Sequence, residues 1–185
     1  MQNLRVLERK DKKRFLEILK KQFDFDENSK RSFEMSEKQS FSEHVRNSKA
    51  ISTSLSNEFD KKLDYVFLIN NKNKVFIVNK DIANIDLNKI RINSVGLYIA
   101  EFSNNEIRLS IEGSQLIGPN SKKNIIELNE KEAREWLKGK DLERETEIEG
   151  FAIIKHNNDY LGSGKSTKQR ILNFIPKTRR LNVSD

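Results

Sequence analysis

The sequence predicts an α+β protein, in which helices and pairs of antiparallel strands follow one another along the chain. Three observations lead to this prediction. A helical amphipathic pattern occupies the start of the chain, short apolar runs separated by turn-forming residues begin at Tyr65, and a well-capped helical pattern precedes the last strands. A parallel sheet would instead need a crossover helix between its strands, and the sequence does not show that alternation.

The first predicted element is a helix over residues 4–23, because its apolar side chains recur on one face of a 3.6-residue period. These side chains are Phe15, Leu16, Leu19 and Phe23. The lysines that lie mostly away from this face are Lys12, Lys13, Lys20 and Lys21. The apolar face is expected to pack on a core. The basic face is either solvated or a contact surface for RNA.

Residues 24–60 differ in composition, because Ser, Glu, Lys and Asn dominate and apolar residues are isolated. This polarity predicts a mobile insertion or weakly held helices, with residues 40–59 as a surface helix. His44 and His156 are the two histidines of the chain. Neither has a second metal ligand at a suitable spacing, so we predict a surface position for His44 and no metal site at either histidine.

Two hairpins are predicted after this segment. Residues 65–69 and 75–78 flank an asparagine-rich connection, and residues 96–102 and 107–111 flank a second one. Asparagine favours turns, and the flanking runs are rich in strand-forming residues. Residues 82–92, between the hairpins, are short and mixed in character.

A second helix is predicted to begin at Asn129. The segment Gly118-Pro119-Asn120 marks a loop upstream, and a short strand at residues 124–128 follows it. With Asn129 as N-cap, Glu132 falls at the third helical position, which predicts a capping box. Trp136 is the single tryptophan, and its place on the apolar face predicts a core anchor rather than a base-stacking platform.

The stretch 150–180 predicts short strands with cations on their loops and on the exit of the last strand. Residues 151–154 read as a buried strand, residues 160–162 as a strand that breaks on glycine, and residues 171–175 as the last strand. Residues 165–168 are expected to form a polar loop between them.

Residues 162–167, with the sequence GSGKST, resemble a phosphate-binding P-loop only in part. The full pattern G-x-x-x-x-G-K-[ST] needs a glycine at position 159, where this chain has Asp159, a carboxylate that would repel phosphate. No helical pattern follows to supply its N-terminal dipole. We interpret the segment as a glycine turn that presents Lys165 and Lys168.

The net charge of +7 is concentrated at the two ends of the chain. Residues 1–23 carry eight Lys and Arg against three Asp and Glu, and residues 150–185 carry seven against two, so the middle is slightly acidic. This distribution suits a polyanionic partner, although generic solvated lysines produce the same composition. The chain has no cysteine, no apolar stretch of membrane-spanning length and no signal-peptide pattern. We therefore expect a soluble cytoplasmic protein without disulfides and without a membrane partner.

Three ordered segments of the chain resemble a known family. The segments are GFAIIK at 150–155, DYLGSGK at 159–165 and NFIPKTRR at 173–180. They are similar to the RNA-binding PUA-like domain at the C-terminus of Nop/Sun-type (RsmF-like) rRNA cytosine-5 methyltransferases. They also resemble small archaeal ribosome-biogenesis proteins that pair a pre-PUA with a PUA domain. The resemblance implies a pre-PUA-like α+β domain at 1–111, containing the polar insertion, and a PUA-like small β-barrel with one marked helix at 112–185.

The resulting hypothesis is a non-catalytic RNA-binding protein, acting on structured rRNA or tRNA in ribosome biogenesis or RNA modification. The residue inventory offers neither a cysteine nucleophile nor a glycine-rich cofactor loop, so no cofactor is expected. Lysine and arginine would contact phosphates, and Tyr160 would stack on a base or join the core. The predicted RNA-binding residues are Lys122, Lys123, Lys155, Tyr160, Lys165, Lys168, Arg170, Lys177, Arg179 and Arg180.

Three alternatives remain open. In the first, the chain would be an adaptor that recruits a separate RNA methyltransferase or binds pre-ribosomal proteins. In the second, it would be an NTP-dependent enzyme that uses residues 162–167. Arg179 and Arg180 also have a structural alternative, in which they pair with the acidic residues of 143–149.

Overall fold

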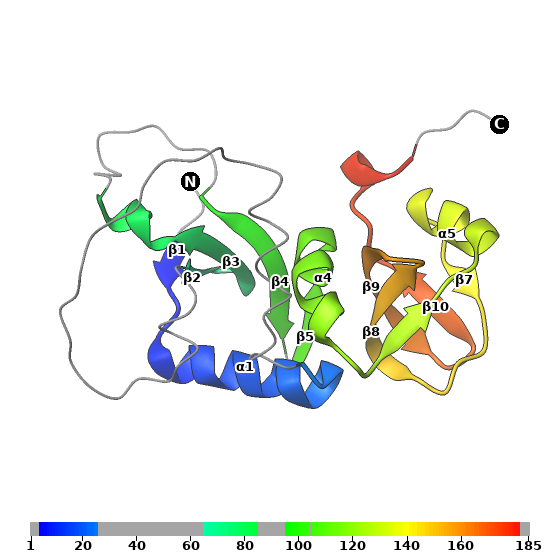
Figure 1. Cartoon of the computed structure of the whole chain (residues 1–185), viewed down its shortest axis with the longest axis horizontal. Coiled ribbons are helices and arrows are strands. Elements are labelled where there is room, and N and C mark those ends of the chain that lie inside the picture. The colour runs from blue at the N-terminus through cyan, green and yellow to red at the C-terminus, as the bar shows by residue number, and fades with distance from the viewer. Residues whose placement is uncertain (1–3, 26–64, 85–94, 104, 182–185) are drawn as a thin grey trace.

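The chain folds as two five-stranded sheets placed side by side, each with a helix against it (Figure 1). This computed structural model describes residues 4–25, 65–84, 95–103 and 105–181. The α+β class predicted from the sequence is confirmed. The predicted insertion beyond residue 25, the surface helix at 40–59, His44 and most of 82–92 lie outside the described residues.

The N-terminal sheet is antiparallel, with the strands in chain order. Its strands are β1 (Leu4–Val6), β2 (Tyr65–Asn70), β3 (Lys74–Asn79), β4 (Leu97–Ser103) and β5 (Glu106–Leu109). The 3-10 helix η1 (Lys80–Asn84) follows β3. Both predicted hairpins are present as β2–β3 and β4–β5. They form because each apolar run is interrupted by turn residues that tolerate positive φ, such as Asn73 at 55° and Asn105 at 64°.

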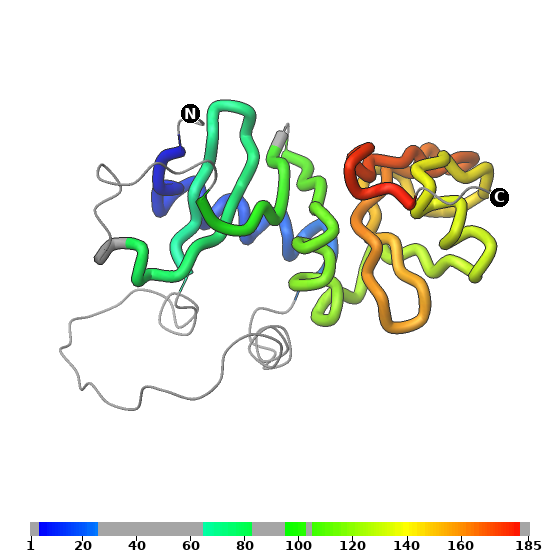
Figure 2. Tube along the Cα trace, turned by 90° about the horizontal axis from the view of Figure 1, so that it is seen from above, coloured from blue at the N-terminus to red at the C-terminus, as the bar shows by residue number. Residues whose placement is uncertain are grey.

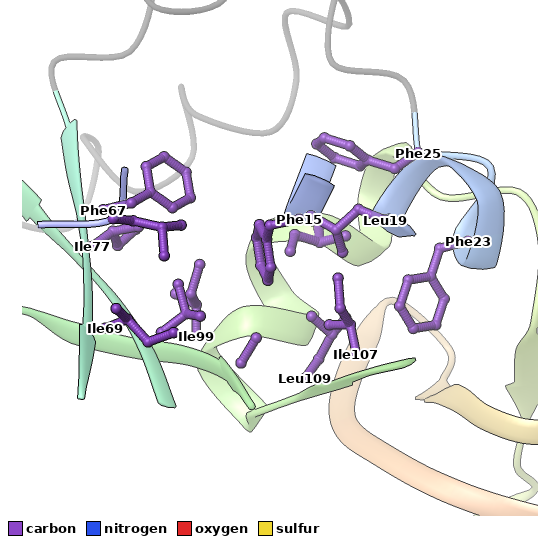
Figure 3. Packing of buried hydrophobic residues seen from close by; sticks show 14 of the residues in the cluster. Phe15, Leu19, Phe23, Phe25, Phe67, Ile69, Ile77, Ile99, Ile107 and Leu109 are labelled. Atoms are coloured by element: carbon purple, nitrogen blue, oxygen red, sulfur yellow. The ribbon is translucent and has the colours of Figure 1, made fainter. Parts of the chain in front are cut away.

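Helix α1 (Arg9–Phe23) covers one face of this sheet and buries the predicted apolar stripe. Phe15 is 1% exposed and makes edge contacts with the rings of Phe67 and Phe102. Figure 3 shows Phe15 and Leu19 directed toward the sheet residues Ile99 and Ile107. The predicted start of this helix is wrong, because residues 4–6 pair with β2 as an edge strand and the helix begins at Arg9.

The C-terminal sheet is curled into a half-barrel and has the order β6-β8-β9-β10-β7 (Figure 1). Its strands are β6 (Ile125–Glu127), β7 (Leu142–Glu143), β8 (Glu149–His156), β9 (Asp159–Thr167) and β10 (Arg170–Asn173). The strands of the stretch 150–180, β8, β9 and β10, pair antiparallel. Strand β6, which lies before that stretch, pairs with β8 in parallel. The predicted polar loop at 165–168 is wrong. Lys165, Ser166 and Thr167 belong to β9, which continues past Gly162 because both of its neighbours pair with it.

Helix α5 (Glu130–Leu137) closes the half-barrel and carries the predicted capping box, in which Asn129 and Glu132 bond each other's backbone N–H. Trp136 is fully buried, as predicted, with its indole N–H donated to the carbonyl of Leu161 at 3.2 Å. Gly139, just beyond the helix, has a φ of +86°, a conformation that glycine adopts without strain. The 3-10 helix η4 (Lys177–Arg179) follows β10, near the end of the described residues.

Helix α4 (Ile111–Ile117) lies at the junction of the two sheets and was not predicted. It packs on β9 and β4, and Figure 2 shows it beside the β8–β9 hairpin. Its N-cap is Ser110, whose hydroxyl accepts the N–H of Gly113, so the strand predicted to reach residue 111 stops at Leu109. The predicted loop at 118–120 is the 3-10 helix η3 (Gly118–Asn120).

Candidate nucleic-acid interface

The ten residues predicted to bind RNA lie at several places on the C-terminal half rather than in one patch. They differ most in whether a carboxylate already neutralises their charge. Lys122 and Lys123 follow η3, Lys177 and Arg179 lie in η4, and Arg180 follows η4. The other members belong to the strands β8 to β10 or lie between them. The surroundings of each side chain therefore decide which of them can hold a phosphate.

Lys122 and Lys123 lie beside the C-terminal end of α1. Both of their backbone N–H groups bond to the carbonyl of Phe23 at 3.0 Å, and the side chain of Asn124 donates to the carbonyl of Gln22 at 2.7 Å. These bonds bring the loop next to the last turn of α1, which carries the exposed Lys20 and Lys21. We call Lys20, Lys21, Lys122 and Lys123 the lysine corner.

The lysine corner is a concentration of four exposed ammonium groups. Within the part of the chain that the structure describes, no carboxylate lies within ion-pair distance of any of the four. Exposed cations without an acidic partner keep their full charge for an external anion. Lys20 and Lys21 lie about a hundred residues before Lys122 and Lys123 in the sequence, and the fold brings the two pairs together.

Five of the predicted cations are instead engaged by carboxylates. Arg170 contacts Asp141 at 2.9 Å and Glu143 at 3.2 Å, and the acidic segment before β8 therefore neutralises it. The remaining pairs are Lys155 with Glu127 at 3.0 Å, Lys165 with Glu106 at 3.7 Å, Lys168 with Glu149 at 3.1 Å, and Arg179 with Glu112. The hydrogen bond from Lys155 lowers the pKa of the Glu127 carboxyl below its usual range. Nearby carboxylates weaken the attraction of these cations for phosphate.

The last three predicted residues have separate environments. Tyr160 is half-buried and packs against Gly118, where a Cβ atom would overlap its ring, so it contributes to the core. Arg180 donates from Nε to the carbonyl of Ile175 at 3.0 Å and lies across Gly139. Lys177 is exposed. The acid paired with Arg179 is Glu112 of α4, not a member of 143–149 as the structural alternative expected.

The P-loop-like residues 162–167 are part of the sheet. Gly164 pairs with Ala152 on one side and Asn173 on the other, and the Ser163 hydroxyl donates to the carbonyl of Leu109 at 2.8 Å. A P-loop binds phosphate through backbone N–H groups that are free of other partners. The strand geometry therefore does not provide that cradle.

A cleft between the two sheets contains residues that the sequence analysis did not select. Its lining includes Lys74 of β3, Tyr98 of β4, Arg108 of β5, Phe174 after β10, and Arg179, and its volume is about 130 Å³. We call it the aromatic cleft. No local sequence signal marks these residues as a group, because they come from four strands or strand ends and from η4.

Within the described ranges, no group of three or more His, Asp or Glu side chains is arranged to hold a metal ion. None of the helices in those ranges combines the length and apolarity needed to span a bilayer.

Comparison with known proteins identifies the C-terminal part of the chain. Residues 123–181 match the family described as the methyltransferase RsmF PUA domain. Three similar proteins are each named ribosomal RNA small subunit methyltransferase F. The Vibrio cholerae protein is 30% identical over 92 residues, the Vibrio parahaemolyticus protein 27% over 138 residues, and the Aeromonas hydrophila protein 31% over 90 residues.

The matches cover 49%, 71% and 48% of this chain in that order, but only 20%, 29% and 19% of the relatives. The aligned part of the chain thus spans less than a third of each relative's length. The curled sheet and its capping helix α5 lie almost wholly within the matched residues. The C-terminal half-barrel is therefore a PUA-like domain that resembles the PUA domain of the rRNA methyltransferase RsmF.

Proposed function

We propose that this chain is a non-catalytic RNA-binding protein that acts on structured rRNA or tRNA as an accessory factor in ribosome biogenesis or RNA modification. Two findings support the proposal. The first is the PUA-like domain, whose relatives are named as rRNA methyltransferases. The second, which carries it, is the lysine corner beside that domain, with four exposed cations that lack an acidic partner among the described residues.

The lysine corner would bind RNA through its phosphates. Lysine presents a point charge with three rotatable donors, which provides affinity and position but little base recognition. Each phosphate contact releases counterions, so affinity should fall steeply as salt rises. A folded RNA with a regular phosphate spacing, such as an rRNA hairpin, suits a corner built from a helix end and a loop.

Two observations support a non-catalytic role: the family match to a PUA domain, and the strand conformation of the P-loop-like residues 162–167. The family match covers the PUA domain, and the P-loop-like residues 162–167 are hydrogen-bonded within β9. The adaptor function predicted as an alternative becomes an outcome of the test below.

The test compares RNA binding by the wild-type protein and a double variant, Lys122→Ala with Lys123→Ala, at several salt concentrations. Fluorescence anisotropy with labelled rRNA hairpins and tRNA gives the dissociation constants. Each lost phosphate contact should reduce the slope of log affinity against log salt by about 1. We expect the double variant to bind more weakly to every RNA and to lose up to about 2 from that slope.

The matched control is Lys10→Ala with Lys131→Ala, which removes the same charge from exposed positions on α1 and α5 away from the lysine corner. It should retain almost the wild-type affinity and slope. Equal losses in both variants would show a general charge effect and contradict a specific corner. Absence of binding to any RNA would reject the proposed function and favour the adaptor.

A further inference from the structure

The aromatic cleft combines planar rings with cations in a way that the proposed phosphate contacts do not use. The guanidinium carbon of Arg108 lies 4.8 Å from the centre of the Phe174 ring, and Lys74 Nζ lies 5.1 Å from the centre of the Tyr98 ring. Behind Phe174, the ring of Phe151 lies 5.7 Å away. Cations at these distances are held by the ring quadrupole.

Each of the two arginines of the cleft forms an ion pair with a carboxylate and still has N–H groups that are free to donate hydrogen bonds. Arg108 is paired with Glu101, and Arg179 with Glu112, each through one terminal nitrogen. A guanidinium group has five N–H donors in a plane, so each arginine retains donors for a further anion. With Lys74 the lining carries three cations, against the two carboxylates that pair with its arginines.

The cleft also offers an apolar surface of suitable size. Phe174 is 37% exposed, so part of its ring is accessible to a ligand. Leu109, Ile111, Ile175 and Pro176 also belong to the apolar part of the lining. A cavity of about 150 Å³ accepts one six-membered aromatic ring, so the cleft volume of about 130 Å³ suits one ring system rather than a helix or a strand.

Burial raises the pKa of the Tyr98 hydroxyl, although the charge of Arg108 opposes the change. Tyr98 therefore keeps its proton at neutral pH and offers a neutral ring with an O–H donor. An unpaired nucleobase has the complementary features, a flat π-face with polar edges and anionic phosphates on either side. Proteins recognise such bases by stacking them on aromatic rings or arginine planes.

We propose that the aromatic cleft binds one unpaired nucleobase of the RNA, stacked on the exposed ring of Phe174, while Arg108 and Arg179 contact the flanking phosphates. This inference rests on the proposed function, since it names a subsite for the same ligand. The lysine corner would attract any folded RNA, and the cleft would select RNA with a bulged or looped nucleotide.

The test uses two hairpin RNAs that differ by one bulged 2-aminopurine nucleotide, together with the full chain. Anisotropy gives the affinity for each RNA, and 2-aminopurine fluorescence reports stacking of the bulged base. We expect the wild type to bind the bulged RNA about tenfold more tightly, with quenching, because stacking on an aromatic side chain contributes at this scale.

Phe174→Leu keeps an apolar side chain but removes the ring, and Arg108→Lys keeps the charge but removes the planar set of N–H donors that would contact the phosphate. Either variant should lose the preference for the bulged RNA while keeping wild-type affinity for the unbulged hairpin. Unchanged melting temperatures show that the variants are folded. Should one variant be unstable, the other decides the outcome.

The outcomes separate this proposal from the proposed function. Binding to both RNAs without preference, or a preference that survives both variants, overturns the cleft as a base site and leaves the RNA-binding function standing. Binding to neither RNA rejects both proposals.

Discussion

The ion pair between Lys155 and Glu127 makes the stability of the fold depend on pH in the acidic range. Glu127 accepts a hydrogen bond from Lys155 at 3.0 Å, and this bond holds the pKa of its carboxyl below the ordinary value of 4.5. A group whose pKa is lower in the folded state stabilises the fold at pH values above its unfolded-state pKa. That stabilisation is lost as the pH falls from about 4.5 through the lower folded-state pKa.

The Glu127→Gln variant should therefore show a smaller decrease in unfolding free energy than the wild type when the pH is lowered below 4.5. Urea unfolding at neutral pH and at pH values below 4.5 measures the difference in midpoint. The variant should be slightly less stable than the wild type at neutral pH and should lose less on acidification. The effect is small because Glu127 is 53% exposed. Glu145→Gln, at an exposed position without an ion-pair partner in the described ranges, is the control and should behave as the wild type. A wild-type response from Glu127→Gln would contradict the prediction.

At the scale of single elements, α5 depends on its first turn. The helix has eight residues, too few to be stable by itself, so the capping box and the burial of Trp136 must fix it. Glu132 serves twice, because it accepts the N–H of Asn129 at 2.9 Å and pairs with Arg144 at 3.1 Å.

Asn129→Ala removes the side-chain acceptor for the N–H of Glu132 and should cost about 1 kcal/mol. Urea unfolding followed by Trp136 fluorescence measures the free energy, with an unchanged denaturant slope. Lys131→Ala, in the same turn but exposed, should change stability by less than about 0.5 kcal/mol. If the two variants were equally stable, the cap would not hold this helix.

Helix α4 depends on close backbone contact. Gly113 lies against β4, and a Cβ at this position would overlap the carbonyl oxygen of Ile99. Backbone cannot move aside as a side-chain end can, so glycine is required here for packing and not for its φ angle.

Gly113→Ala should destabilise the protein by about 1–3 kcal/mol, the usual cost of overpacking, despite alanine's higher helix propensity. Thermal and urea unfolding measure this cost. Gln115→Ala, at an exposed position of the same helix, should leave stability within about 0.5 kcal/mol of the wild type. A stabilised Gly113→Ala variant would mean that α4 does not approach β4 this closely.

At the scale of the whole molecule, buried polar bonds join the two sheets. The Ser163 hydroxyl of β9 donates to the carbonyl of Leu109 of β5 at 2.8 Å, in a buried position. Ser114 of α4 accepts the N–H of Gly162 of β9 at 2.9 Å, at a site without exposure to solvent. Separation of the sheets would exchange such bonds for bonds to water, at a net cost for each of about 0.5–1.5 kcal/mol.

We therefore predict that the two halves unfold together. Trp136 fluorescence reports the C-terminal core, and far-UV circular dichroism reports α1, the longest helix in the described ranges. Their urea curves should coincide. Ser114→Ala leaves the N–H of Gly162 unpaired and should shift both curves together by about 1–3 kcal/mol. A shift of the fluorescence curve alone would show that the halves unfold independently.

The sequence by itself determined the elements whose causes are local. The stripe of α1, the asparagine turns of both hairpins, the capping box of α5 and the burial of Trp136 follow from periodicity and turn chemistry within a few residues. The resemblance of 150–180 to a PUA-like domain was also readable, because it rests on short ordered strings. Cationic residues were readable as candidates, but their charge partners were not.

Only the tertiary structure decided the features that join distant residues. The strand at 4–6, the parallel pairing of β6, and the continuation of β9 through Gly162 depend on neighbouring strands that supply hydrogen bonds. The lysine corner needs the carbonyl of Phe23 to meet the loop at Lys122. Likewise, the aromatic cleft needs β5 beside the exit of β10. Local propensity cannot encode such contacts, because their free energy arises when remote surfaces are buried together.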